Sequence, residues 1–137
     1  MRWHTRNFLN QSTSLDDELF RQYELPGLEQ LLQECDACVL VYSCTDRRSF
    51  ELLRQVWEEL RRGNGFDEDS KATVLEQLWV VHDNLDIDES EWQVSFADGE
   101  RWSSRISATF RAVSTRTGQG AKDFRQEVAR RVLESQS

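Results

Sequence analysis

Three short apolar segments, each followed by an amphipathic stretch, constrain the fold of this chain more than any other feature. The apolar segments are residues 38–43, 77–81 and 109–114, and the stretches with helical spacing are 49–62, 95–105 and 121–134. The first segment is apolar at neighbouring positions, as in a strand that is buried on both faces. The order strand, helix, strand, helix, strand, helix predicts an α/β fold, a three-stranded and mostly parallel sheet with flanking helices.

The first 34 residues differ from the rest of the chain. Apolar spacing predicts short helices over residues 15–23 and 28–34, and we expect Pro26-Gly27 to separate them. We therefore divide the chain into a polar N-terminal segment with short helices, residues 1–34, and an α/β domain, residues 35–137.

Composition and charge limit the functions that the chain can have. Hydrophobic residues make up 38% of the 137 residues, with five Trp and seven Phe, which is enough for a packed core. The net charge of −8 disfavours a nucleic-acid partner or an anionic membrane. We find no membrane-spanning run, no signal peptide and no C-terminal cysteine for a prenyl anchor. We therefore expect a cytoplasmic protein without a lipid anchor.

Three stretches match, in order and in spacing, the motifs of one protein family. Residues 36–50 read DACVLVYSCTDRRSF, residues 80–87 read VVHDNLDI, and residues 112–120 read AVSTRTGQG. They resemble the DAxxLVYSxTDxxSF, LVGNKxDL and ETSAKTGQG passages of the Ras-superfamily small GTPases. The resemblance covers about residues 35–134. It implies an incomplete Ras-like P-loop NTPase fold, a partial G domain without the family's first strand.

The phosphate-binding motifs of that family have no match in these 137 residues. A P-loop needs G-x-x-x-x-G-K-[ST], but none of the six glycines is followed by lysine. The family's D-x-x-G also fails, because no aspartate stands three residues before a glycine. Two glycines before the last helix, Gly118 and Gly120, are a weak signal for a phosphate loop. We therefore expect no catalytic residues, no GTP hydrolysis and no cofactor; binding of GTP or GDP is implied by the resemblance alone and is weak.

The resemblance places a guanine-reading loop at residues 83–86 and 114–116. Asp83 stands where the family has asparagine, Asn84 where it has lysine, and Asp86 matches the family's aspartate. Asp86 can accept two hydrogen bonds from a guanine edge, whereas an ionised Asp83 cannot donate one to guanine N7. Ser114-Thr115-Arg116 stand where the family has S-A-K. The candidate site residues are therefore Asp83, Asn84, Asp86, Ser114, Thr115 and Arg116. If guanine binds, we expect the Asp86 side chain and the Thr115 backbone N–H to contact it.

Other interpretations of the same loop stay open. It is equally well a solvated turn at a strand end, and we expect His82 to be a surface or loop residue there. A calcium loop is disfavoured, because Glu91 and Ala97 occupy the positions that need glycine and glutamate. A divalent metal held by Asp83, Asp86 and Asp88 in an enzyme of another kind has no supporting spacing, so we expect no metal site.

The cysteines offer one further motif. Cys35 and Cys38 form C-x-x-C, but the motif leads into a strand, which does not lower a thiol pKa as a helix N-terminus does. We interpret them as small buried hydrophobic residues rather than as a redox pair or zinc ligands.

Two functions follow from these expectations. The first is a non-catalytic pseudo-GTPase that acts through protein interaction in signalling. Strand 38–43 lacks its family neighbour, and either residues 3–9 or another chain can pair with its exposed edge. Cys44-Thr45-Asp46 and helix 49–62 are further candidate partner surfaces. The alternative is a fragment of an active GTP-binding signalling GTPase.

Overall fold

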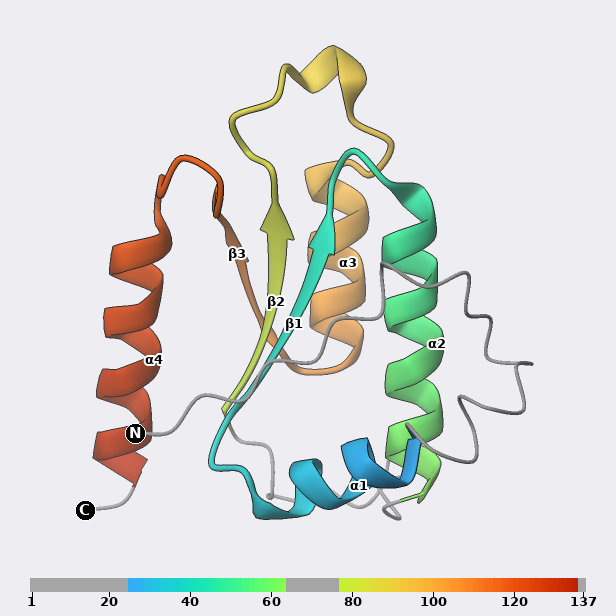
Figure 1. The fold of residues 1–137 in the computed structure, drawn as a ribbon, viewed down its shortest axis with the longest axis vertical. Coiled ribbons are helices and arrows are strands. Elements are labelled where there is room, and N and C mark those ends of the chain that lie inside the picture. The colour runs from blue at the N-terminus through green and yellow to red at the C-terminus, as the bar shows by residue number, and fades with distance from the viewer. Residues whose placement is uncertain (1–24, 64–76, 136–137) are drawn as a thin grey trace.

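A computed structural model of the chain describes residues 25–63 and 77–135. The elements in chain order are α1 (Leu25–Glu34), β1 (Cys38–Ser43), α2 (Arg47–Gly63), β2 (Leu78–Asp83), the short 3₁₀ helix η3 (Glu89–Glu91), α3 (Phe96–Arg105), β3 (Thr109–Ala112) and α4 (Ala121–Ser135). The strands form one sheet in the order β1-β2-β3, and both neighbouring pairs are parallel. Figure 1 shows α4 on one side of this sheet and α2 and α3 on the other. The predicted α/β fold is confirmed.

The strand register brings the three loops that follow the strands to one edge of the sheet. Ser43, the last residue of β1, pairs with Asp83, the last residue of β2. His82 in turn pairs with Ala112, the last residue of β3. Because parallel strands share a carboxyl edge, the segments that leave these residues start side by side. This edge carries every predicted site residue.

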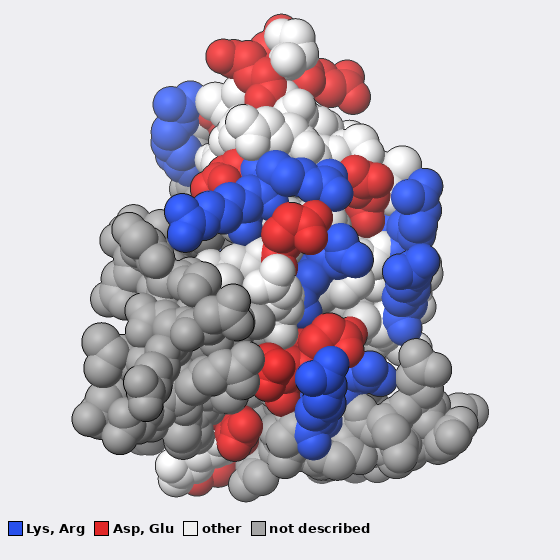
Figure 2. All heavy atoms as spheres, turned by 90° about the vertical axis from the view of Figure 1, so that its right-hand side faces the viewer, with Lys and Arg blue, Asp and Glu red and all other residues white. Residues whose placement is uncertain are grey.

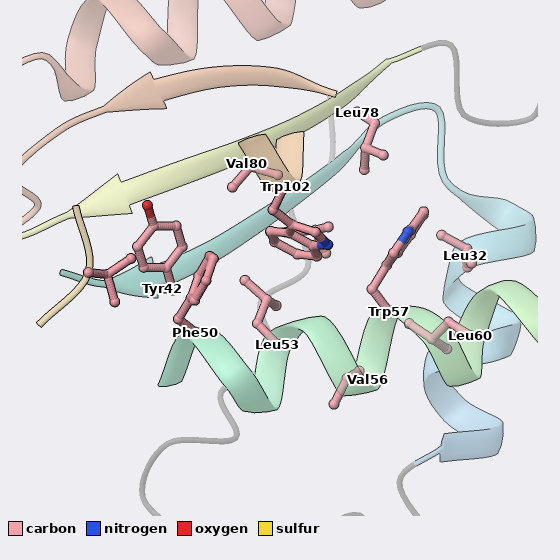
Figure 3. Close-up of a cluster of buried hydrophobic side chains, with 12 residues drawn as sticks. Leu32, Tyr42, Phe50, Leu53, Val56, Trp57, Leu60, Leu78, Val80 and Trp102 are labelled. Atoms are coloured by element: carbon pink, nitrogen blue, oxygen red, sulfur yellow. The ribbon is translucent and has the colours of Figure 1, made fainter. Parts of the chain in front are cut away.

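Most of the core lies between the sheet and the helices α2 and α3 (Figure 3). Its twelve buried members are Leu32, Leu40, Tyr42, Phe50, Leu53, Val56, Trp57, Leu60, Leu78, Val80, Val94 and Trp102. A smaller cluster on the other face joins Trp79 of β2 to Val128 and Val132 of α4. Burial of these apolar surfaces fixes the sheet, and so fixes the positions of the loops at its edge.

Local hydrogen bonds decide where the helices begin. The Asp46 carboxylate accepts from the backbone N–H groups of Arg48 and Ser49 at 3.0 and 3.3 Å, so α2 begins at Arg47, two residues before the predicted start. The Ser95 hydroxyl caps α3 by accepting from the Asp98 N–H at 3.1 Å. The predicted helices at 49–62 and 95–105 are therefore confirmed, with an earlier start for the first.

The helix predicted over residues 28–34 begins earlier than expected. Pro26 and Gly27 lie inside the first turn of α1, which begins at Leu25. Proline is tolerated there because the first N–H groups of a helix have no intrahelical acceptor. The predicted helix over residues 15–23 lies outside the described residues, and the division at residue 34 stays a prediction.

His82 is also placed differently from our expectation of a surface or loop residue. It is fully buried in β2, its Nδ1 lies 2.7 Å from the Tyr42 hydroxyl, and its ring centroid lies 4.7 Å from that of Trp92 and 4.8 Å from that of Phe96. Burial lowers the pKa of His82 to about 4, so the ring is neutral at neutral pH. The signal in the sequence was that no Gly, Pro or Asn occurs from Leu78 to Asp83, which lets the strand continue through His82.

Candidate functional site at the carboxyl edge of the sheet

Backbone hydrogen bonds fix the three loops to one another. The Cys44 N–H donates to the Asp83 carbonyl at 3.1 Å, and the Leu85 N–H donates to the Val113 carbonyl at 3.1 Å. The loop after β2 is thus tied to the loops after β1 and β3. All six candidate residues come together here, as the parallel sheet predicts.

Both carboxylate oxygens of Asp83 accept hydrogen bonds from the same chain. One carboxylate oxygen, Oδ1, accepts from the backbone N–H groups of Thr115 at 2.9 Å and Asn84 at 2.7 Å. The other, Oδ2, accepts from the Thr115 hydroxyl at 2.8 Å. The Thr115 N–H, which we expected to meet a base carbonyl, therefore already has an acceptor.

Asp86 is also occupied. Its Oδ1 accepts from the hydroxyl of Ser114 at 2.6 Å. Its Oδ2 accepts from Nε and Nη2 of Arg116, at 3.1 and 2.6 Å. The Ser114 hydrogen bond, followed by the bonds and charge of Arg116, holds the pKa of Asp86 below its usual value. Asp86 is therefore an ionised acceptor that already has donors at both oxygens.

Asn84 links this loop to β1. Its backbone is left-handed, with φ of 70°, a conformation that asparagine tolerates better than most residues. Its side-chain Nδ2 donates to the Ser43 hydroxyl at 2.6 Å. Its backbone carbonyl accepts from the Cys44 thiol at 3.5 Å. Ser43, which the sequence analysis did not select, thus takes part in the site through a side chain at the end of β1.

The turn after β3 positions Ser114 and Arg116. Ser114 is buried, its N–H donates to the Gln119 carbonyl at 2.9 Å, and its carbonyl accepts from the Gly118 N–H at 2.8 Å. Gly118 and Gly120 have positive φ, 85° and 75°, which explains why glycine stands at both positions. The turn is structural in this arrangement, and its glycines allow the Ser114 side chain to reach Asp86.

An open hollow of about 400 Å³ lies beside these residues. Thr45, Asn84, Ile87, Glu91 and Arg116 line it. Its walls carry one acidic side chain, Glu91, and one basic side chain, Arg116. Asp88, which we weighed as a metal ligand, instead caps η3 by accepting from the Ser90 N–H at 2.9 Å. Within residues 25–63 and 77–135, no group of three His, Cys, Asp or Glu side chains is arranged to hold a metal ion.

The cysteines in the described residues are free thiols. Cys35 and Cys38 are partly buried, where we predicted buried residues, and they pack against the large hydrophobic cluster. Burial raises the pKa of Cys38 to about 12, so this thiol is not a nucleophile at neutral pH.

No helix in the described part of the chain is long and apolar enough to cross a bilayer.

The fold and this edge define a Ras-like α/β domain, and comparison with known proteins identifies the family. The Ras family model matches residues 22–134, so the chain belongs to the Ras family. Ras-like protein 1 of Saccharomyces cerevisiae is 34% identical over 88 residues, which cover 64% of this chain and 26% of that protein. Ras-like protein rasU of Dictyostelium discoideum is 26% identical over 85 residues, 62% of this chain and 36% of that protein. The chain thus spans about a third or less of the relatives' length.

Proposed function

We propose that this chain is a non-catalytic member of the Ras family that acts through protein interaction in cytoplasmic signalling. The observation that carries the proposal is the closure of the candidate guanine loop on itself. Both carboxylates of the loop, Asp83 and Asp86, are bonded to residues 114–116 of the same chain. A guanine base that uses Oδ2 of Asp86 or the Thr115 N–H has to compete with the bond that the atom already makes.

The energetics of the closed loop favour weak nucleotide binding. Each polar contact that a buried site leaves unmade costs about 1–3 kcal/mol, and Asp83 presents only acceptor atoms to a base. Phosphoryl transfer also needs cationic groups and backbone donors at the transferred phosphate. Arg116 is the basic residue that lines the hollow, and its guanidinium is engaged by Asp86. These features support a chain that does not hydrolyse GTP.

The first strand supports the part of the proposal that concerns protein interaction. Among the described residues, β1 pairs with β2 alone, so its other edge has no strand there. Val41, in the middle of β1, leaves 45% of its surface exposed. An edge strand with exposed apolar side chains is suited to adding a strand from another chain.

Helix α2 offers a different kind of surface. Figure 2 shows basic and acidic side chains interspersed over the described part of this face. Ion pairs account for the mixture, at 3.0 Å for Arg47–Glu51, 3.4 Å for Arg54–Glu51 and 2.9 Å for Arg61–Glu58. A surface of balanced charge is not the basic footprint that phosphate backbones need, which favours a protein as the partner.

A second candidate function rests on the coverage of the relatives. The chain spans 26% of one relative and 36% of the other. We therefore keep the proposal that these residues are part of an active GTP-binding signalling GTPase, whose phosphate-binding residues are encoded elsewhere. An in-frame P-loop coding sequence upstream of Met1 in the transcript supports this candidate; a stop codon in every upstream frame opposes it.

Calorimetric titration of the purified 137-residue chain with GDP and GTP, with and without magnesium, tests the first proposal. The positive control is a small GTPase with an intact G-x-x-x-x-G-K-[ST] loop under the same conditions. We expect no saturable heat from this chain up to millimolar nucleotide. A dissociation constant of about 1 mM corresponds to a binding free energy of about −4 kcal/mol, so any binding is weaker than that. Micromolar, magnesium-dependent binding overturns the proposal.

A further inference from the structure

The side chain of Arg116 lies where an external ligand of Asp86 has to bind. It donates from Nε and Nη2 to one carboxylate oxygen, and Ser114 donates to the other. Arg116 also lines the open hollow beside the loop. The guanidinium is therefore located between the carboxylate and the space from which a small molecule can approach.

The two partners of this contact differ in how firmly they are held. The Asp86 side chain is 11% exposed and is fixed from behind by the buried Ser114, whereas the Arg116 side chain is 72% exposed. In the described part of the chain, Asp86 supplies the side-chain contact that holds the guanidinium. An exposed ion pair adds little stability, because solvent screens it and the long side chain loses rotamer freedom. The carboxylate is thus a fixed acceptor with a removable occupant.

The chemistry of the occupant defines the class of ligand that competes with it. A guanidinium offers neighbouring N–H donors on one planar frame, and this pattern suits a carboxylate. Guanine offers the same pattern on its N1–H and 2-amino groups. Inosine keeps N1–H and lacks the amino group, and adenine has an acceptor at N1.

We propose that Arg116 is an intramolecular occupant of the base site: its guanidinium takes the place of a guanine edge at Asp86, and its removal opens the loop to guanine. The inference rests on the proposed function only in taking residues 83–86 and 114–116 as the candidate base loop. The hydrogen bonds between Thr115 and Asp83 stay in place when Arg116 is removed. The increase in guanine affinity therefore comes from the Asp86 contact alone.

The test is a titration with guanosine, which has no phosphate and so does not depend on a phosphate site. The probes are guanosine, inosine and adenosine, followed by backbone amide NMR at Asn84–Ile87 and Ser114–Thr117. The variants are Arg116→Ala, Arg116→Lys and the double variant Arg116→Ala with Asp86→Ala. Arg125→Ala is the matched control, because Arg125 is an exposed arginine on α4 and its loss changes the net charge equally.

We expect Arg116→Ala to bind guanosine roughly two- to sixfold more tightly than the unaltered chain and Arg125→Ala, because an exposed ion pair is a weak competitor for the carboxylate. We expect Arg116→Ala to raise the affinity for inosine less than that for guanosine, and to leave the affinity for adenosine unchanged. In the double variant the affinity for guanosine returns to that of the unaltered chain. Arg116→Lys falls between, because an ammonium has no planar pair of donors. Equal guanosine affinity in Arg116→Ala and Arg125→Ala overturns the inference, as does an equal gain for adenosine, which indicates that Arg116 merely filled space.

The outcomes separate this inference from the proposed function. Failure of Arg116→Ala to gain guanosine affinity removes the inference and leaves a non-catalytic Ras-family chain in place. Micromolar binding of GTP with magnesium by the unaltered chain removes the proposed function. In that case the guanosine ratio between Arg116→Ala and Arg125→Ala still tests whether Arg116 occupies the site.

Discussion

The interior of the sheet and its carboxyl edge are held together by different forces. In the interior, neighbouring residues of β2 such as Trp79 and Val80 are fully buried under helices on opposite faces. At the edge, carboxylates, hydroxyls and a guanidinium satisfy one another at the protein surface. Apolar burial is non-directional and hard to replace, whereas each polar partner at the edge can be exchanged for another. The comparison teaches that the edge can change its chemistry while the interior keeps the fold.

The largest effect is expected from a truncation in the interior. Phe50 is buried, and its ring centroid lies 4.7 Å from Tyr42 and 5.7 Å from Trp102 (Figure 3). Phe50→Ala leaves a cavity between α2 and the sheet, and we expect it to lower the free energy of unfolding by about 3–5 kcal/mol. Urea unfolding followed by tryptophan fluorescence measures this loss.

Leu133 provides the control for that truncation. It is an apolar residue of α4 with 64% of its surface exposed, so Leu133→Ala removes little buried area. We expect a change within about 0.5 kcal/mol. If Leu133→Ala costs as much as Phe50→Ala, Leu133 is buried in solution and the exposed face of α4 is an interface.

The next effect concerns His82, a buried ring of β2, and it depends on pH. The pKa of His82 is lowered to about 4 by burial, against about 6.5 in an unfolded chain. Between these values the unfolded chain binds a proton that the folded chain does not, so stability falls as pH falls from 6.5 towards 4. From pH 7 to pH 5 we expect a loss of about 2 kcal/mol from this group.

The measurement is the difference between the unaltered chain and His82→Phe in urea unfolding at pH 7, 6 and 5. All other groups are the same in the two chains, so the difference isolates the contribution of residue 82. We expect the variant to lose less stability than the unaltered chain over this range, although it is less stable at pH 7 because the Tyr42 hydroxyl loses its partner. Parallel pH dependences contradict a buried neutral His82.

The interior was largely predictable from sequence because burial leaves a periodic record. The continuous apolar run of β1 and the helical spacing in α2 and α4 identified these elements within a few residues. The errors were local. The Asp46 cap extended α2, Pro26 fitted a first turn, and His82 was hidden because a neutral buried histidine has the same letter as an exposed charged one.

The edge was predictable only in part. The parallel order of the strands was enough to bring Asp83 and Asp86 to residues 114–116. The partner that each carboxylate takes was not, because it depends on the turn that Gly118 and Gly120 allow and on which donors compete at distances of 2.6–3.1 Å. Sequence spacing describes neighbours along the chain and carries no record of such competition.

A smaller effect is expected from the first carboxylate of the edge. Asp83→Ala removes the acceptor of the Thr115 N–H and hydroxyl and of the Asn84 N–H, and we expect a loss of about 1–2 kcal/mol. Asp83→Asn keeps one oxygen for the two N–H groups, and the Thr115 hydroxyl can rotate to accept from the new amide, so we expect a loss below about 0.5 kcal/mol. Urea unfolding of the two variants separates them; equal losses mean that the charge of Asp83, and not its acceptor geometry, holds the turn.

The smallest effect on stability is expected from Arg116, whose contact we propose to be the functional one. Arg116→Gln removes an exposed guanidinium, and we expect the urea midpoint at pH 7 to stay at that of the unaltered chain.

The pKa of Asp86 rises in the variant Arg116→Gln, because Arg116 lowers it through hydrogen bonds and charge. It rises less than in Ser114→Ala, since the Ser114 hydrogen bond is the larger cause. The lowered pKa of Asp86 favours the folded state at pH above the unfolded value, and this contribution is lost as pH falls from the unfolded to the folded value. The contribution is therefore smaller in both variants, and its loss is complete at a higher pH. Carboxyl carbon NMR titration of Asp86 measures the order. An unchanged pKa in Arg116→Gln means that the guanidinium does not rest on Asp86 in solution, and the edge is then open to ligands without any displacement.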